Sequence, residues 1–418
     1  MSTNSTSLAH LSNIVQGRNK QLGLNLSAKQ AFNVPNNLRS EYVIIPSTSA
    51  PQFGSYFIID VKEKNVVISD LIINFNVSAI TGTTGGPVAN HPNFSPATFW
   101  MQKIELVINN VTVDTLYPVQ LFVTQQFLFE DEDRVSNNNL QGNYAAAGQR
   151  NTMALTAGQN YYVKLRSFYN ECHLPILTDA HNLQIRIYMD SVANIVNTNG
   201  LGGTPAATLN FCNAIVKLMK LPQEVASNRL ALMQKSPEHN IFHNVRYSPF
   251  NVNSGVALTS IVLTPFIGNI VALFFVVRNS NSITKEAAHT FTAISSFEIL
   301  DSTSANCVGG QPIPSQLALQ YLNSFNSRSS YTNETTVGAN ITGNVINNSA
   351  NVYCWSFSSN LPEALAHGVL LGHRKFLGNE ILKLTFAGVT GASQQVDVWA
   401  FCQSVIEQGA GFVKIMAM

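Results

Sequence analysis

Charged side chains are scarce in this sequence, in which Asp, Glu, Lys and Arg make up only 11% of the 418 residues. A typical soluble protein contains roughly 25%. Because 45% of the residues are hydrophobic, the polar surface must consist mainly of Asn, Ser, Thr and Gln. Charged residues are also depleted from the buried centres of protein interfaces. The composition therefore indicates a chain that covers much of its surface with neighbouring subunits.

A strong charge of either sign is also missing. The net charge is +1 and the sequence contains no run of Lys and Arg, so no long-range field attracts nucleic acid or an anionic membrane. We expect no sequence-specific nucleic-acid binding. Arg18 and Lys20 could contact a membrane or nucleic acid, but two charges contribute little binding, and a solvated segment is the simpler interpretation.

Long hydrophobic runs are absent as well. The longest, IVALFFVV at Ile270–Val277, is far shorter than the roughly 20 residues that cross a bilayer, and it is typical of a buried strand. The N-terminal stretch MSTNSTSLAHLSNIVQGRNK has no basic start followed by an apolar segment. We therefore expect no secretory signal and synthesis in the cytosol.

Closely spaced cysteines are the last absence. The cysteines are widely separated, odd in number and never form Cys-x-x-Cys, which predicts neither a disulfide framework nor a zinc site. This pattern favours a reducing compartment. The five residues are Cys172, Cys212, Cys307, Cys354 and Cys402.

Short β-type segments are what the sequence has in abundance. Residues 1–40 are polar, rich in Gln and Asn and too poor in apolar groups to cover a core, so we interpret them as an arm. From Tyr42 onward, runs rich in Val, Ile, Phe and Thr alternate with Gly, Pro, Asn and Ser, as in SYFIIDV, DLIINFNVSAI and LQIRIYM. The pattern predicts an all-β chain, and the length favours two domains of about 200 residues each.

The stretch FWMQKIELVINNVTVDTLYPVQLFVTQQFLFEDED predicts a hairpin followed by a helix. Apolar residues alternate with polar ones over Ile104–Ile108, as in a half-buried strand. Asn109-Asn110 then supplies a two-residue turn, because Asn tolerates positive φ. Pro118 suits the first turn of a helix, and large apolar residues follow it at helical spacing. We expect this helix to pack against its own domain or a neighbouring subunit through Leu121, Phe122, Leu128 and Phe129.

Two motifs recur in the same order in the second half of the chain. The sequence PVQL at 118–121 is answered by PSQL at 314–317, and residues 167–181 are answered by residues 356–367, with Ser-Phe, Leu-Pro and Ala-His pairs in common. Together they indicate a tandem duplication. We divide the chain into an arm (1–40), a first β domain (41–221), a connecting helix or linker (222–238) and a second β domain (239–418).

Antiparallel domains of this size form barrels, sandwiches or jelly rolls. Three segments, FWMQKIELVINNVTVDTLYPVQLF, RSFYNECHLPILTDAHNLQIRIYMDSVANI and CNAIVKLMKLPQEVASNRLALMQKSPEHNIFHNV, resemble the major capsid proteins of the double jelly-roll lineage. That lineage includes adenoviruses, virophages, Polinton-like viruses and nucleocytoplasmic large DNA viruses. The resemblance runs from about Tyr42 to the C-terminus and is strongest between Phe99 and Val245.

This resemblance implies an all-β fold of two tandem eight-stranded jelly rolls with short inserted helices. It implies a structural virion protein, assembled inside the host cell, that forms a homotrimer. The six rolls of such a trimer imitate a hexamer, and these pseudo-hexameric capsomers tile an icosahedral shell around double-stranded DNA. Neighbouring capsomers, penton and minor capsid proteins, and in many members an internal membrane, are the implied partners.

Candidate metal sites are weak. His239 and His243 would place two imidazoles on one face of a helix, but Asn240 replaces the glutamate of the H-E-x-x-H motif, and the segment is more typical of a strand. The acidic cluster Glu130–Asp133 could hold a cation between subunits, although a solvated loop is the simpler interpretation.

Candidate catalytic groups are equally weak. His173, Asp179 and His181 lie close together in sequence, but no G-x-S-x-G or H-E-x-x-H motif occurs, and satisfied polar groups at the start of a strand are the simpler interpretation. The segment GLGGTP lacks the third glycine of a dinucleotide-binding loop, so we expect a surface loop. We expect no enzymatic activity, no metal and no cofactor.

Two other functions remain as alternatives to a shell protein. A cupin-type enzyme needs clustered His and carboxylate ligands, and the sequence does not contain such a cluster. A carbohydrate-binding, lectin-like jelly roll predicts exposed aromatic residues in loops. Trp100, Trp355 and Trp399 instead lie within runs typical of strands.

Overall fold

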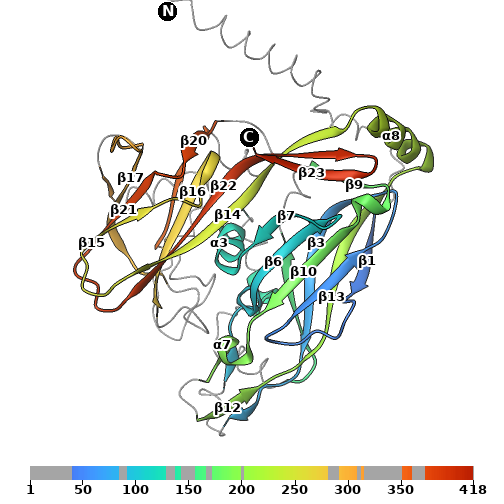
Figure 1. Cartoon of the computed structure of the whole chain (residues 1–418). Helices are drawn as coiled ribbons and strands as arrows, with labels where there is room; N and C mark the ends of the chain where they lie inside the picture. Colours follow the sequence, from blue (N-terminus) through green and yellow to red (C-terminus); the bar gives the residue numbers. More distant parts are fainter. Residues whose placement is uncertain are drawn as a thin grey trace, which may run out of the picture.

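The computed structural model describes residues 40–83, 92–128, 137–142, 156–165, 172–198, 202–280, 291–307, 312–314, 351–359 and 372–417. In these residues two β-rich halves lie side by side, the first coloured blue to green and the second yellow to red (Figure 1). The predicted arm up to residue 39, the acidic cluster Glu130–Asp133, Phe129 and the side chain of Leu128 lie outside the described residues.

The described residues of the first half form two main antiparallel sheets and two small two-stranded ones. Its main strands are β1 (Ser40–Pro46), β2 (Tyr56–Val61), β3 (Val66–Val77), β6 (Met101–Ile108), β7 (Val111–Leu116), β8 (Gln159–Leu165), β10 (Leu183–Met189) and β13 (Leu209–Lys220). The sheet orders are β1-β13-β3-β8 and β2-β10-β6-β7. When these eight strands are numbered along the chain, the two orders are 1-8-3-6 and 2-7-4-5.

The second half repeats this arrangement. Its main strands are β14 (Glu238–Val252), β15 (Leu258–Val262), β16 (Ile267–Asn279), β17 (Ile294–Leu300), β18 (Ile313–Pro314), β19 (Val352–Ser356), β21 (Ile381–Phe386) and β22 (Gln394–Gly409). The sheet orders, β14-β22-β16-β19 and β15-β21-β17-β18, are again 1-8-3-6 and 2-7-4-5. Two eight-stranded sandwiches of this order are jelly rolls, so the predicted fold class is confirmed.

Smaller features follow the same duplication. Each half adds a short strand to its third main strand: β9 (Pro175–Ile176) pairs with β3, and β20 (Arg374–Leu377) pairs with β16. The PVQL motif follows the fifth main strand of the first half, and the PSQL motif overlaps the end of the fifth main strand of the second. The first residues of these two motifs, Pro118 and Pro314, therefore occupy similar places in the two halves, while residues 315–317 and most of the second echo lie outside the described residues.

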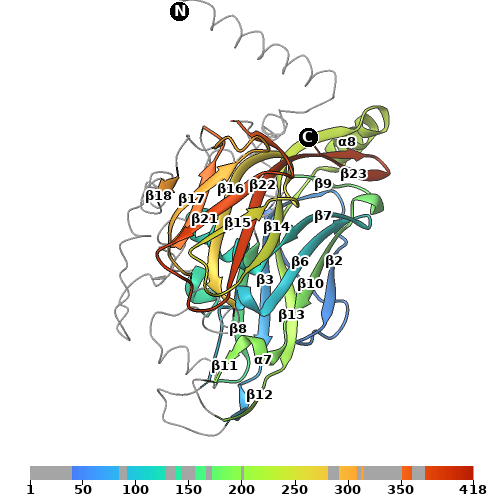
Figure 2. The same cartoon turned by 60° about the vertical axis from the view of Figure 1, so that its left-hand side comes forward.

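The remaining elements are short. The first half also contains the 3-10 helices η2 (Ala97–Trp100) and η3 (Asp179–His181), the helices α3 (Pro118–Leu128) and α7 (Val192–Ile195), and the strands β4 (Thr81–Thr83), β5 (Asn93–Phe94), β11 (Val196–Asn197) and β12 (Gly203–Ala206). Helix α8 (Gln223–Lys235) leads into the second half, and β23 (Phe412–Ala417) follows β22 (Figure 2). Among the described residues, no helix combines the length and hydrophobicity that a membrane crossing requires.

The prediction of a surface loop at GLGGTP, residues 200–205, is wrong from Gly203 onward, because these residues form a strand. Gly203 begins strand β12, which pairs with β4. Gly203 has a φ of 100°, and a Cβ atom there would lie 2.4 Å from the carbonyl oxygen of Gly82. Glycine therefore allows two backbones to approach closely at this point.

The predicted turn at Asn109-Asn110 is confirmed. The two residues have φ values of 47° and 62°, and Ile108 pairs with Val111 directly across the turn. Positive φ at both central residues matches the right-handed twist of the flanking strands, and Asn is one of the few residues that adopt it readily.

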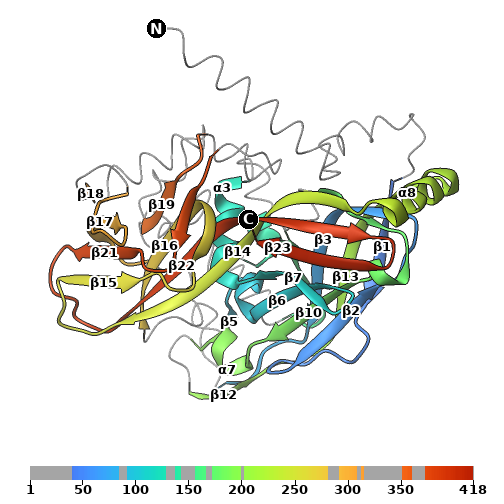
Figure 3. The same cartoon turned by 45° about the horizontal axis from the view of Figure 1, so that its top comes forward.

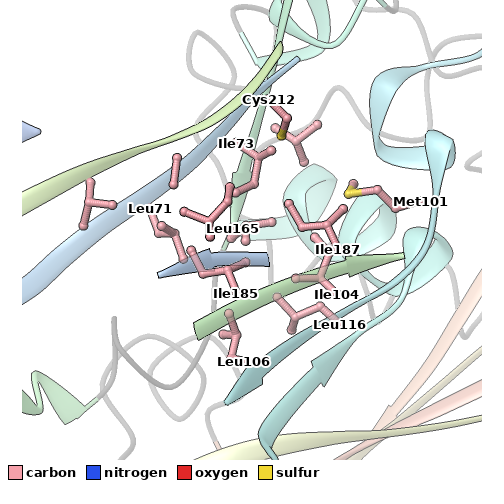
Figure 4. Close-up of a cluster of buried hydrophobic side chains, with 14 of the residues drawn as sticks. Leu71, Ile73, Met101, Ile104, Leu106, Leu116, Leu165, Ile185, Ile187 and Cys212 are labelled. Carbon is pink, nitrogen blue, oxygen red and sulfur yellow. The ribbon is translucent and has the colours of Figure 1, made fainter. Parts of the chain in front are cut away.

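Each half has its own core between its two sheets. Alternate residues of β10, including Ile185 and Ile187, are fully buried, and Figure 4 shows them facing Leu71 and Ile73 of β3 across the first core. The second core includes Phe275, Phe297, Tyr353 and Leu384. Because side chains alternate between the faces of a strand, each of these strands also presents an outer face, and the outer faces determine how the halves meet.

Candidate functional site at the junction of the two halves

The histidines that could have bound a metal lie on a strand. His239 and His243 both belong to β14, so their Cα atoms are separated by about 13 Å along the strand. His239 Nε2 instead lies 3.9 Å from Glu407 Oε1. Among the described residues, no group of three or more His, Cys, Asp or Glu side chains is positioned to hold a metal ion.

The residues that suggested a catalytic group point to different partners. Asp179 is exposed and its carboxylate lies 3.1 Å from Lys64 Nζ. His181 is buried, and its Nε2 donates to the carbonyl oxygen of Gly409 at 2.6 Å. Burial lowers the pKa of His181, so the neutral imidazole is favoured. His173 has a positive φ of 48°. This arrangement is structural, because His181 fixes the turn between β22 and β23.

The described residues form a buried hydrophobic cluster between the two halves, which we call the junction. From the first half it contains Phe99, Val119, Phe122 and Val123, which lie on η2 and α3. From the second half it contains Phe291 and the outer face of the β14-β22-β16-β19 sheet, with Val245, Val271, Ala272, Phe274, Val276, Val352, Cys354, Trp399 and Phe401. Figures 1 and 3 show α3 between that sheet and the strands β6 and β7.

Helix α3 contacts both halves at once. Leu121 is 2% exposed and belongs to the core of the first half, whereas Phe122 is fully buried and belongs to the junction. The ring of Phe122 lies 5.1 Å from that of Phe99. The backbone amide of Leu121 donates to Tyr117 O at 2.8 Å, which joins the helix to the end of β7. The packing expected for Leu128 and Phe129 stays a prediction.

The junction accounts for the apolar run at Ile270–Val277. Within this part of β16, Phe275 faces the core of the second half and Phe274 faces the junction. All eight residues are buried. A strand that is covered on both faces needs apolar side chains at every position, so the run is a buried strand, as predicted.

A buried ion pair lies beside the aromatic residues of the junction. Arg278 Nε donates to Asp397 Oδ2 at 2.6 Å, and the two side chains are 6% and 0% exposed. The Tyr247 hydroxyl donates to the other carboxylate oxygen. The Tyr247 ring stacks on Tyr117 of the first half at 4.3 Å. Burial, together with the Asp397 carboxylate, raises the pKa of Tyr247 far above its usual value, so the phenol stays protonated and remains a donor.

Sequence reasoning did not identify Tyr247, Arg278 or Asp397. A signal was present, since Asp397 interrupts the apolar stretch VDVWAF and Arg278 ends the run IVALFFVVR. A charged residue inside a buried strand requires a partner. Two such residues on different strands therefore indicate a buried pair, although their pairing requires the sheet order.

A second connection is made by the C-terminal hairpin of β22 and β23. Phe242, Ile406 and Val413 come from the second half of the sequence but belong to the core of the first half. Gln408 Nε2 donates to Pro175 O at 2.8 Å, and Thr178 Oγ1 donates to Ala410 O at 3.2 Å. Figure 3 shows this hairpin lying across the strands of the first half. We refer to residues 404–417, which comprise the last six residues of β22, the turn after it and β23, as the strap.

Helix α8 also belongs with the first half. Ala226 and Met233 pack against Val67 and Leu177. Arg229 forms two hydrogen bonds of 2.7 Å with the carboxylate of Glu238, where β14 begins. The connection between the halves is thus fixed at both ends, and the junction, the strap and α8 hold the two rolls as one unit.

Several solved structures that this chain resembles are capsid proteins. A PBCV-1 virus capsid protein superposes with a TM-score of 0.65 at 14% identity, covering 92% of this chain and 98% of that chain. The Faustovirus major capsid protein gives 0.64 at 9% identity with 96% and 98% coverage, and the mavirus major capsid protein gives 0.52 at 13% identity with 92% and 91% coverage. No protein-family model and no curated sequence matches the chain. The chain therefore has the double jelly-roll fold of these capsid proteins.

Proposed function

We propose that this chain is the major capsid protein of an icosahedral double-stranded DNA virus. The observation that carries the proposal is the agreement of fold over nearly the full length of both chains in each comparison. The role is structural rather than enzymatic, and the protein acts in the virion after assembly in the host cell.

The proposal includes a homotrimer that acts as a pseudo-hexameric capsomer. One chain supplies two rolls of the same strand order, so three copies arranged around an axis supply six similar units. A surface with only 11% charged residues supports extensive contacts between copies. The proposed partners are further copies, neighbouring capsomers, penton and minor capsid proteins, and an internal membrane.

The domain division remains part of the proposal. Residues 41–221 and 239–418 form the two rolls, and residues 222–238 contain the connecting helix, which is observed at Gln223–Lys235. The strap contacts the first roll although it belongs to the second half of the sequence. A fragment that ends before the strap would therefore leave the first roll with an incomplete core.

The carbohydrate-binding alternative is not supported. Sugar-binding loops present exposed aromatic rings, but Trp100 and Trp399 are fully buried. Trp355 lies in strand β19 and is partly buried against the second core. No observation on the described residues favours this function over a shell protein.

Light scattering coupled to size exclusion, followed by negative-stain microscopy, tests the proposed function on the purified full chain. We expect a species of three times the 45.6 kDa chain mass with a hexagonal outline, and shell-like particles at high concentration. A stable monomer at micromolar concentration, with no trimer after crosslinking, would refute the proposal.

A further inference from the structure

The chain covers the same place on its two rolls differently. In the first roll, β13 ends at Lys220 and helix α8 folds back onto the sheet, where it packs against Val67 and Leu177. In the second roll, the equivalent strand β22 runs on into the strap, which lies on the first roll. Among the described residues, no helix follows β22 to take the place of α8 on the second roll.

The register of the strands shows which residues of the two rolls correspond. The pairing of the third main strand with the eighth shifts once in each roll, at Ser69 of β3 and at Val271 of β16. When these two positions are aligned, Leu71 falls on Leu273, and both side chains face the core of their roll. The short strands β9 and β20 also pair with the aligned parts of β3 and β16 in the same register. The alignment therefore holds at the end of the roll that α8 covers.

The residues that correspond to the surface beneath α8 are exposed in the second roll. Leu177, which is 8% exposed beneath the helix, falls on Leu377, which is 61% exposed. Asn65, whose side chain donates to Gln223 at the start of α8, falls on Ile267, which is 52% exposed. Figure 1 shows α8 and β20 at the upper ends of their halves. A place that one roll covers with a helix is thus an exposed apolar surface in the other.

Ile267 and Leu377 are held in a fixed arrangement. They pair directly across β16 and β20. The Glu380 carboxylate accepts hydrogen bonds from the backbone amides of Leu377 and Gly378, both at 2.9 Å. At Gly378, which has a φ of 84°, a Cβ atom would lie 2.9 Å from Cγ1 of Ile267, so the turn packs closely against that side chain. Because the surface is formed before a partner arrives, little conformational entropy is lost on binding.

Positive charge borders the apolar pair. Lys375 is exposed and pairs with Asn269. Because alternate residues of a strand share a face, both lie on the same face as Ile267 and Leu377. Arg246 donates to the carbonyl oxygen of Ile267. We call the surface made by Ile267, Asn269, Lys375 and Leu377 the second-roll site. Its charge complements acidic side chains rather than basic ones.

We propose that the second-roll site binds an acidic amphipathic helix of another protein, much as α8 covers the first roll. Helix α8 shows what such a partner needs, since its buried side chains Ala226 and Met233 lie about two turns apart on one face. On the partner, an equivalent apolar face lies over Ile267 and Leu377, and Asp or Glu beside that face contacts Lys375. The site belongs to a single folded chain, so it goes beyond the proposed function and does not require trimers.

Two synthetic peptides provide the probes, both based on residues 221–236, LPQEVASNRLALMQKS. The acidic peptide carries Arg229→Glu and Lys235→Glu, and the basic peptide carries Glu224→Lys. The apolar face is the same in both. Fluorescence anisotropy measures their binding to the purified full-length chain. We expect the acidic peptide to bind at least about tenfold more tightly than the basic one, and we expect this preference to weaken in high salt.

Variants of the site test whether its residues bind the peptide. Leu377→Ser should weaken binding of the acidic peptide about tenfold or more, because covering a leucine side chain contributes about that much. Leu232→Ser is the matched control, since Leu232 is 65% exposed but lies on α8, and it should leave binding unchanged. Lys375→Glu should reverse the preference, so that the basic peptide binds more tightly. Equal affinity in wild type and Leu377→Ser, or an unchanged preference in Lys375→Glu, would overturn the inference.

Photo-crosslinking locates the bound helix. A photoreactive amino acid replaces the methionine of the acidic peptide that corresponds to Met233, and mass spectrometry identifies the crosslinked residues. We expect crosslinks to residues 263–269 and 374–380. Crosslinks to Val67 or Leu177 would show that the peptide displaces α8 instead, and they would overturn the inference.

Two further measurements exclude other occupants of the site. Deleting residues 1–39 should leave the affinity for the acidic peptide unchanged, whereas tighter binding would show that this segment occupies the site. Leu377→Ser should leave the concentration at which oligomers dissociate unchanged, whereas a higher value would show that a second copy occupies it. Either contrary result, or no binding of the acidic peptide to wild type at about 1 mM, would overturn the inference.

The outcomes separate the inference from the proposed function. A chain that forms no trimers but binds the acidic peptide through Leu377 would overturn the capsid function and leave the second-roll site standing. Trimers that form while the peptide does not bind would do the reverse. If circular dichroism shows that Leu377→Ser does not fold, Ile267→Ser replaces it, and an unchanged affinity for the acidic peptide again overturns the inference.

Discussion

Removing one partner of the buried ion pair at the junction should destabilise the protein much more than removing both. In Asp397→Leu, the Arg278 guanidinium, which is 6% exposed, loses the carboxylate that lies 2.6 Å away. Breaking a buried pair in this way costs about 3–5 kcal/mol, a large part of the roughly 5–15 kcal/mol that stabilises a folded domain. Arg278→Met should cost a similar amount, because it leaves the carboxylate buried without that partner.

The double variant Arg278→Met/Asp397→Leu separates the charge effect from the loss of contacts. Neither charge is then buried. The remaining losses are the acceptor for the Tyr247 hydroxyl, which is worth about 1–3 kcal/mol, and the acceptor for Gln395 Nε2, whose side chain is partly exposed and can bind water instead. We therefore expect the double variant to be more stable than either single variant. A surface pair provides the control: Lys220 Nζ and Glu41 Oε1 also lie 2.6 Å apart, but the two side chains are 50% and 26% exposed. Lys220→Met should cost no more than about 1 kcal/mol.

Guanidinium denaturation followed by tryptophan fluorescence and circular dichroism measures these differences. The two signals should change together, because the junction joins the rolls and their unfolding is coupled. A double variant that loses as much free energy of unfolding as the two single variants together would show that burial does not control the strength of this pair. The same conclusion would follow if Lys220→Met lost as much free energy of unfolding as Asp397→Leu.

Three other changes test separate parts of the fold. Phe122→Ala removes a fully buried ring of α3 and should cost about 3–5 kcal/mol of stability. Its control, Leu232→Ala at a 65% exposed position, should cost at most about 0.5 kcal/mol. Equal denaturation midpoints for the two variants would contradict the packing of α3. Burial lowers the pKa of His181 below the ordinary value of 6.5, so on acidification the unfolded chain binds a proton at this residue before the folded chain does. The stability that the neutral His181 contributes is therefore complete above about pH 6.5 and is lost as the pH falls. The thermal midpoint of wild type should therefore fall more steeply on acidification than that of His181→Gln, and equal slopes would contradict this. At Asn110, with a φ of 62°, replacement by Ala should cost about 1–2 kcal/mol and replacement by Gly should be nearly neutral in the same denaturation assay.

The strands and turns could be predicted because their signals are local. Alternation over Ile104–Ile108 and two asparagines that tolerate positive φ determine the hairpin without reference to distant residues. The run at Ile270–Val277 likewise indicated a buried strand. The duplication could be inferred because PVQL and PSQL each begin at or just after the end of the fifth main strand of their half.

The junction could not be predicted in the same way. Leu121 and Phe122 are adjacent and both apolar, yet one belongs to the first core and the other to the contact with the second roll. Helical periodicity identifies a face but not the partner of that face. Asp397 and Arg278 are separated by more than 100 positions in sequence, and their pairing depends on β22 lying next to β16. The strap shows the same limit, because the alternation of Val413 and Ile415 indicates a strand without indicating which roll it covers.

The strap also determines when the first roll can finish folding during synthesis. Ile406 and Val413 belong to the core of that roll, so the ribosome must release residue 413 before the core is complete. Domains usually fold in the order in which they are made, but here the first roll waits for β23, which is made after all the main strands of the second roll. A ribosome that stops before β23 is made therefore yields a first roll with exposed apolar surface, which quality-control chaperones can recognise.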